Sequence, residues 1–85
     1  MNNPDLRNAL MRLLWRCDPL PVMKRTAASE MDIALSAPVS TAEFDEALAA
    51  LRDEGLLRLA QNRLLGETVL SLTREGIAEC QRAFG

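Results

Sequence analysis

The feature that most constrains the fold is the stretch of residues 40–57, which reads STAEFDEALAALRDEGLL. Ser40 followed by Glu43 is a capping-box pattern, in which the serine hydroxyl accepts a hydrogen bond from a backbone N–H of the first turn. Apolar residues then recur at helical spacing, at Phe44, Ala47, Leu48 and Leu51. Gly55 predicts the end of this helix, because glycine adopts the left-handed conformation there without a steric penalty. The stretch therefore predicts a capped helix that leads directly into a new apolar segment.

Two further helices are predicted before residue 40. Asn3-Pro4-Asp5 is a typical helix start, with an asparagine cap, a proline in the first turn and an acidic residue near the positive end of the helix dipole. An apolar stripe continues this helix until the prolines of residues 18–21 end it; the stripe is Leu6, Leu10, Leu13, Leu14 and Cys17. The second helix is expected from Val22 or Met23 to Leu35. Its core-facing ridge is Met23, Ala27, Met31 and Leu35.

The remaining chain predicts a hairpin and a last helix. Residues 56–61 and 68–72 alternate apolar and polar side chains and are predicted strands, joined by a loop over residues 62–67 that contains Gly66. Thr73 is the expected cap of a helix over residues 74–84. The turn at residues 36–39 is short, which places the second and third helices in a helix-turn-helix arrangement. We therefore predict one domain over residues 1–85, mainly α with a small β-hairpin (α+β).

The order helix, helix, helix, strand, strand, helix resembles that of winged helix-turn-helix domains. The motifs EGLL after the third helix and LTREG at the start of the last are similar to those of many prokaryotic regulators of this fold. The resemblance assigns no family within the fold. It implies that the third helix enters the major groove of DNA and that the hairpin, called the wing, touches the DNA backbone. It also implies one short strand beside the wing, expected at Val39.

Charge is distributed unevenly along the chain, although the formal net charge is only −2. Residues 1–25 carry five basic and two acidic side chains, for a net charge of +3. Residues 26–55 carry seven acidic side chains against Arg52 alone, for a net charge of −6, and the last thirty residues come to +1. The basic and acidic segments are therefore expected to face different neighbours.

Catalysis is not expected from this sequence. The chain contains no histidine, the residue most often used for proton transfer, and no glycine-rich phosphate loop. Two cysteines without histidine do not make a zinc site, so no metal is expected. The sequence also gives no indication of a cofactor or a small-molecule substrate. No apolar run approaches the length of a membrane span, and we expect a cytoplasmic protein.

The third helix argues against direct recognition of DNA bases, since its predicted outer face carries acidic and small side chains. The residues expected there are Ala42, Glu43, Glu46, Ala49 and Asp53. Affinity for DNA comes chiefly from lysine and arginine at phosphates, and this face has neither. The main hypothesis is therefore a non-catalytic module that acts through protein contacts on this face, in a regulatory setting. The alternative is a DNA-binding transcriptional regulator whose phosphate contacts come from Lys24, Arg25, Ser40, Thr41 and Arg63.

Apolar residues on the first helix and in the wing loop bear on whether the protein self-associates. Met11 and Trp15 lie off the apolar stripe of the first helix, so they either pack beneath another element or, with Phe84, form a homodimer surface. Leu64 and Leu65 in the wing loop are typical of contact residues unless they fold back onto the core. Cys17 and Cys80 are expected to be buried thiols, and a disulfide between them requires the first and last helices to pack together.

Overall fold

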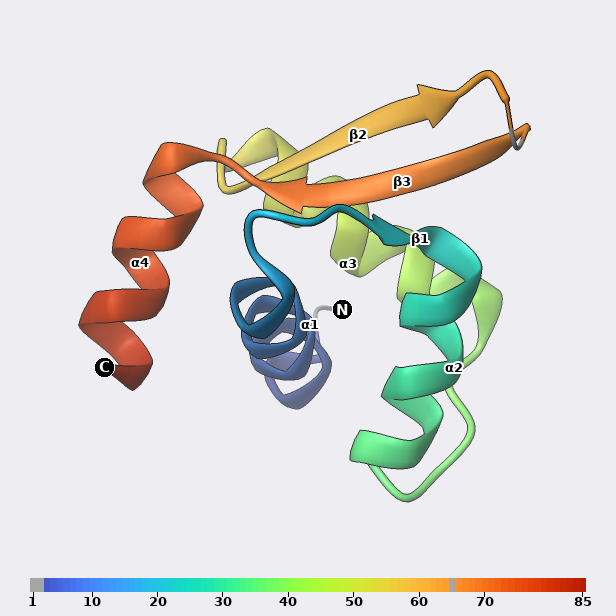
Figure 1. Ribbon diagram of the computed structural model, residues 1–85. Coiled ribbons are helices and arrows are strands. Elements are labelled where there is room, and N and C mark those ends of the chain that lie inside the picture. Colours follow the sequence, from blue (N-terminus) through green and yellow to red (C-terminus); the bar gives the residue numbers. More distant parts are fainter. Residues whose placement is uncertain (1–2, 65) are drawn as a thin grey trace.

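The computed structural model describes residues 3–64 and 66–85 of the chain. Its elements, in order, are α1 (Pro4–Cys17), β1 (Val22–Met23), α2 (Lys24–Ala34), α3 (Thr41–Asp53), β2 (Leu57–Asn62), β3 (Glu67–Leu72) and α4 (Arg74–Phe84). The strands form one antiparallel sheet in the order β1-β3-β2. Figure 1 shows α1, α2 and α3 beneath this sheet and α4 at the end where β3 leaves it. The predicted α+β class and the order of helices and hairpin are confirmed.

Side-chain caps begin three of the helices, as predicted. Asn3 accepts hydrogen bonds from the N–H groups of Asp5 and Leu6 at the start of α1. The Ser40 hydroxyl accepts from the N–H of Glu43 at the start of α3, and the Thr73 hydroxyl accepts from that of Gly76 at the start of α4. Each such cap is worth about 1 kcal/mol, so local sequence fixes where these helices begin.

Helix α3 ends at the predicted glycine. Gly55 has φ +78°, its N–H donates to the carbonyl of Arg52, and the N–H of Leu56 donates to that of Leu51. These two bonds form a Schellman motif, which closes a helix through a residue in the left-handed conformation. The Thr73 hydroxyl also donates to the Gly55 carbonyl at 2.6 Å, so the end of α3 is tied to the start of α4.

The core lies between the three N-terminal helices and the sheet. Its fully buried large side chains come from α1, α2, α3, β3 and α4; they are Leu6, Leu10, Leu14, Met31, Leu51, Leu70 and Cys80. Burying a leucine or methionine side chain contributes about 1.5–3 kcal/mol, and α1 supplies more of these residues than any other element. Helix α1 is therefore the central helix around which the sheet and the other helices pack.

The second helix begins later than predicted, at Lys24, because Val22 and Met23 form β1. Val22 pairs with Leu70 and Met23 with Val69 of β3, so the backbone is extended where the apolar ridge suggested a helix. At the other end, Leu35 is the C-cap of α2 and not a helical residue. Strands β2 and β3 both begin and end within one residue of the predicted bounds.

The prediction of a short strand at Val39 was wrong. Val39 lies in the turn between α2 and α3, where its N–H donates to Oδ1 of Asp32 at 2.9 Å. The strand beside the hairpin is β1, which precedes α2. The loop after α1 delivers residues 22–23 to the free edge of β3, and that edge is then filled before Val39 is reached.

Candidate functional site

The start of α2, the start of α3 and the turn end of the wing enclose an open depression of about 440 Å³. Its lining includes Lys24 and Arg25 from α2, Thr41 and Asp45 from α3, and Glu67 from β3. The short α2–α3 turn brings the two helices together, and the pairing of β1 with β3 holds the wing beside them. The structure thus gathers three of the predicted phosphate contacts, Lys24, Arg25 and Thr41, in one place.

Two ion pairs cross this depression. Nζ of Lys24 lies 2.9 Å from Oδ1 of Asp45, and a guanidinium nitrogen of Arg25 lies 2.8 Å from Oε1 of Glu67. The four side chains are 28% to 72% exposed, and ion pairs of this kind contribute only about 0–1 kcal/mol to stability. Both cations thus lie next to carboxylates in ion pairs that can be broken at a small cost in free energy. Sequence reasoning missed these pairs because each partner lies on a different element.

The N-terminus of α3 presents a capped first turn. The Ser40 hydroxyl accepts the Glu43 N–H at 3.1 Å and lies 3.3 Å from a carboxylate oxygen of Glu43. The cap therefore already uses the hydroxyl that was predicted to contact phosphate. Thr41 is exposed and lines the depression. Backbone N–H groups at a helix start also favour an anion, so Thr41 and this first turn remain available to a phosphate.

The outer face of α3 is acidic, as its sequence indicates. Ala42, Glu43, Glu46 and Asp53 are exposed, whereas Ala49 is half-buried. Arg52 lies beside this face with its Nε 3.6 Å from Oδ1 of Asp53. The side chains that most often read base edges are arginine, lysine, asparagine and glutamine, and Arg52 alone among them lies on α3.

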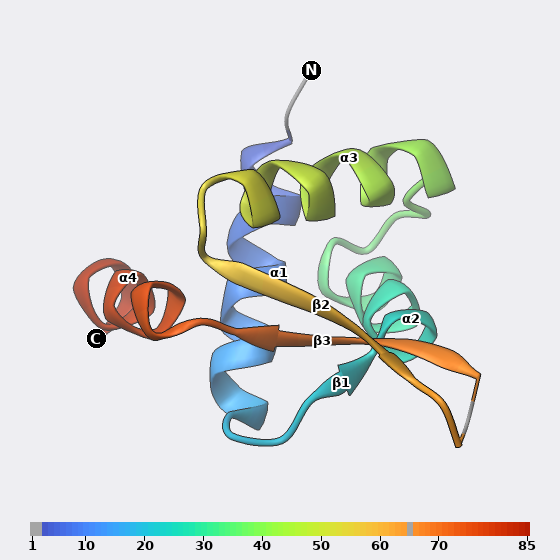
Figure 2. The ribbon, with the colours of Figure 1, turned by 90° about the horizontal axis from the view of Figure 1, so that it is seen from above.

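The wing is a two-stranded arm with an ordered turn. Figure 2 shows the β2–β3 hairpin projecting past α2 and α3. At its end the N–H of Leu64 donates to Oδ1 of Asn62 at 3.0 Å, and the N–H of Gly66 donates to the Asn62 carbonyl at 2.8 Å. Arg63 is exposed, as predicted for a wing-tip contact, and Leu64 is 97% exposed and does not fold back onto the core. Leu65, the other loop leucine, lies outside the described residues.

The predicted homodimer surface is corrected at one position. Met11 is 3% exposed and lies in the core, because α4 packs over this second face of α1 and the Cys80 thiol donates to the Met11 carbonyl. Trp15 and Phe84 are half-buried, and their ring centroids lie 6.4 Å apart. The Arg12 guanidinium stacks 4.6 Å from the centre of the Phe84 ring. Of the three predicted interface residues, Trp15 and Phe84 therefore retain surface for a second copy.

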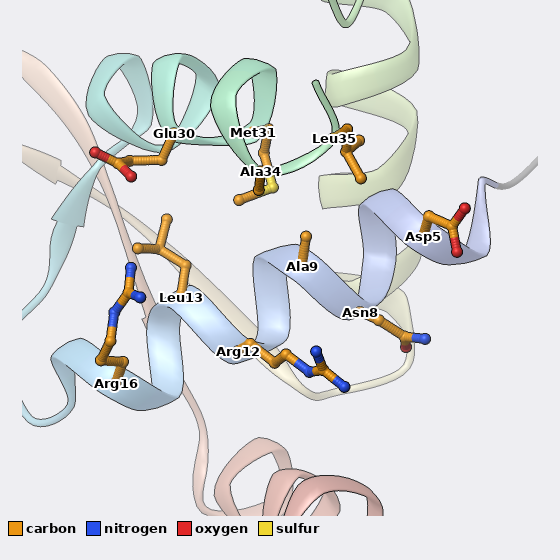
Figure 3. Close-up of a pocket in the computed structure, with 10 residues that line it drawn as sticks. All are labelled: Asp5, Asn8, Ala9, Arg12, Leu13, Arg16, Glu30, Met31, Ala34 and Leu35. Atoms are coloured by element: carbon orange, nitrogen blue, oxygen red, sulfur yellow. The ribbon is translucent and has the colours of Figure 1, made fainter. Parts of the chain in front are cut away.

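A groove of about 420 Å³ between α1 and α2 was not anticipated from the sequence. Figure 3 shows its apolar floor between the helices, with Arg16 of α1 and Glu30 of α2 at one end. Asp5 and Arg12 also line it, so both signs of charge are present. This mixed charge does not favour a nucleic acid, and the groove lies apart from the depression described above.

Both cysteines are free thiols. Burial raises the pKa of the Cys80 thiol above its ordinary value of 9.0, and the neighbouring charge of Glu79 raises it further. A raised pKa keeps the thiol neutral and unreactive. Among the residues that the structure describes, no three histidine, cysteine, aspartate or glutamate side chains are grouped so as to hold a metal ion. No helix within residues 3–64 and 66–85 combines the length and apolar character that a membrane crossing needs.

No protein-family model and no curated protein matches this sequence significantly. Solved structures do match its fold. The PcaV transcriptional regulator from Streptomyces coelicolor, solved with its natural ligand, superposes with a TM-score of 0.74 and 22% identity over 96% of this chain. A proposed DNA-binding protein from Ralstonia eutropha JMP134 gives a TM-score of 0.73 and 19% identity, with both chains covered completely. F-93 of SSV1 gives a TM-score of 0.67 and 26% identity, and the match covers 89% of this chain and 79% of F-93.

This chain spans about half of PcaV, 52% of its length. At these identities the likeness concerns the fold and not the ligand or target of any one neighbour. In this chain the fold consists of the helix-turn-helix formed by α2 and α3, the β2–β3 hairpin and the short strand β1 paired beside it. The chain therefore has the winged helix-turn-helix fold, as found in transcriptional regulators.

Proposed function

We propose that this chain is a DNA-binding domain of a transcriptional regulator and acts without catalysis. The observation that carries the proposal is the depression of about 440 Å³ formed by α2, α3 and the wing, with Lys24, Arg25 and Thr41 in its lining. PcaV is a transcriptional regulator of this fold, and the Ralstonia protein of full matching length is a proposed DNA-binding protein. These neighbours favour DNA over the protein-contact hypothesis that the acidic α3 suggested.

The proposed contact is to the DNA backbone, through cations that exchange partners. Lys24 and Arg25 leave Asp45 and Glu67 to bind phosphates, and Arg63 meets the backbone or groove from the wing. Because the two ion pairs are exposed, the exchange has a small free-energy cost. Duplex DNA carries a negative charge every ~1.7 Å along its axis, so phosphates compete effectively for these cations at low salt.

The acidic residues of α3 set the expected strength of binding. Glu43, Glu46 and Asp53 oppose the approach of phosphates, so affinity should be modest and strongly dependent on salt. A glutamate accepts a hydrogen bond from the amino group of cytosine, and this is the base contact that α3 offers. We therefore expect weak general binding and, if an operator exists, a cytosine at the position that faces α3.

A protein partner is the second candidate, favoured by the exposure of Ala42, Glu43, Glu46 and Asp53 on one side of α3. Such a partner would present basic side chains to this surface. Self-association through Trp15 and Phe84 is compatible with either candidate.

Fluorescence anisotropy of a labelled random-sequence duplex, titrated with the protein at low and at physiological salt, separates the two candidates. Binding at low salt that weakens steeply as salt rises supports the DNA-binding proposal. No binding at low salt refutes it and directs the search to a basic protein partner for α3.

A further inference from the structure

The tip of the wing carries an apolar side chain that the fold does not use. Leu64 is 97% exposed, compared with 72% for Ile33 and 71% for Leu20, the other exposed large apolar residues of the described chain. Turn positions usually hold glycine, asparagine, aspartate or serine, whose conformations or side chains suit the turn. A leucine at this position does not pack against the described fold, so its apolar side chain is available to contact a partner.

The tip holds Leu64 in a defined position. The last pair of the hairpin joins Asn62 to Glu67, so Leu64 lies two residues beyond the paired strands. The Asn62 side chain accepts the Leu64 N–H, and Gly66 closes the turn with φ +64°. Leu64 is therefore presented at the end of a slender hairpin, which Figures 1 and 2 show reaching past α2.

The half of the wing that carries Leu64 is the basic part of this region. Residues 56–66 contain Arg58 and Arg63 and no acidic side chain. Arg63 is exposed and directly precedes Leu64. An apolar tip beside an arginine matches the minor groove of DNA, where negative potential attracts arginine and where apolar side chains enter between base pairs.

We propose that Leu64 is a wedge that enters the minor groove of duplex DNA next to Arg63 and partly unstacks one base step. The inference rests on the proposed DNA binding and adds which groove the wing enters and what it does there. The minor groove is only about 6 Å wide, and the turn end of the hairpin, which presents Leu64, is a narrow part of the described chain suited to enter it. Unstacking is cheapest at pyrimidine–purine steps such as TA, and the kink turns the duplex toward the major groove.

The test uses two labelled short duplexes, one with TA steps at its centre and one of G·C pairs throughout. End-to-end energy transfer reports bending, and 2-aminopurine beside the central TA step brightens when that step unstacks. Leu64→Ser removes the wedge, and Leu20→Ser is the matched control, another exposed leucine, in the loop after α1. We expect the wild type and Leu20→Ser to bend the TA duplex and brighten 2-aminopurine. Leu64→Ser should do neither and should bind this duplex roughly tenfold more weakly, which is about 1.4 kcal/mol.

Three results would overturn the wedge while leaving DNA binding intact. They are equal bending by Leu64→Ser and the wild type, equal affinity of the wild type for both duplexes, and no rise in 2-aminopurine emission on saturation. If Leu64→Ser instead changes the molar mass in light scattering and leaves bending unaltered, Leu64 contacts a protein and the wedge is again refuted. Failure of the wild type to bind either duplex at low salt would refute the proposed function itself.

Discussion

The ammonium group of Lys24 lies 2.9 Å from a carboxylate oxygen of Asp45, which joins the first residue of α2 to α3. Beside it, Arg25 joins α2 to Glu67 of the wing. The two cations best placed to meet DNA phosphates are thus engaged with carboxylates in the same depression. DNA must displace those carboxylates, so Asp45 and Glu67 are expected to weaken binding by competing with phosphate.

Neutralising both carboxylates should therefore tighten DNA binding. In Asp45→Asn with Glu67→Gln, Lys24 and Arg25 are free before DNA arrives and two repulsive charges are removed. We expect about a tenfold gain in affinity, and a salt slope steeper by up to roughly 0.9 for each cation freed. Anisotropy titrations across a salt series measure both quantities.

A second variant controls for net charge alone. Asp18→Asn with Glu75→Gln removes the same two charges from exposed positions at the end of α1 and the start of α4. If this variant gains as much affinity as the first, the effect is one of overall charge and the competition within the depression is refuted.

Two glycine-to-alanine substitutions should differ in cost because their surroundings differ. A Cβ on Gly76 would lie 2.1 Å from the Leu56 carbonyl oxygen, which is backbone and cannot move away cheaply. A Cβ on Gly55 meets nothing within 4 Å, so only its φ of +78° opposes the change. We expect Gly55→Ala to cost about 1 kcal/mol and Gly76→Ala about 3 kcal/mol or more in chemical denaturation. Equal costs would contradict the close packing of α4 against the turn after α3.

The two thiols should differ in reactivity. Cys17 is half-buried, whereas Cys80 is fully buried with a raised pKa. With an aromatic disulfide reagent near neutral pH, we expect Cys17 to react in the folded protein and Cys80 to react only on unfolding. Single Cys17→Ser and Cys80→Ser variants assign the two phases. Prompt modification of Cys80 in the folded protein would show that α4 opens readily from α1.

The raised pKa of Cys80 also gives a direction for alkaline stability. The unfolded thiol ionises near its ordinary value of 9.0, while the folded thiol stays protonated to higher pH. The folded state therefore holds more protons in this window, and the free energy of unfolding falls as pH rises above about 9. Cys80→Ala should lose this part of the pH dependence, as urea titrations at several pH values can measure.

The caps and the ends of α3 and α4 could be predicted because they depend on neighbours in the sequence. Ser40, Gly55 and Thr73 each act on residues within one or two turns, and the structure uses all three as expected. Strand β1 could not be predicted in the same way. Met23 continues an apolar ridge of helical period, but its pairing with Val69 of β3 decides its conformation.

The features that the sequence left open or missed are also non-local. Met11 lies off the main stripe of α1, and the sequence left open whether it packs beneath another element or faces a second copy; its burial depends on α4 covering a second face of that helix. Lys24 and Asp45 meet only because α2 and α3 are held in a helix-turn-helix. The acidic face of α3 was visible from its spacing, yet the carboxylate beside each cation was not.

A homodimer through α1 and α4 is tested at Phe84, which retains surface beside Trp15. If a second copy packs there, Phe84→Ser should halve the molar mass in light scattering at micromolar concentration. Ile33→Ser, an exposed residue on α2, is the control and should leave the mass unchanged. A wild type that is already a monomer, or a Phe84→Ser variant of unaltered mass, would contradict this interface; circular dichroism checks that the variant is folded.

The most direct test of the account is the affinity of Lys24→Glu with Arg63→Glu for a labelled random-sequence duplex, measured by anisotropy at low salt beside the wild type. Both substitutions lie where α2 and the wing are proposed to meet phosphates. Arg16→Glu with Arg74→Glu makes the same change in net charge at exposed positions elsewhere. We predict that the first variant loses DNA binding and its salt dependence, while the second keeps most of its affinity. Equal affinity of the wild type and the first variant would contradict DNA binding through α2 and the wing.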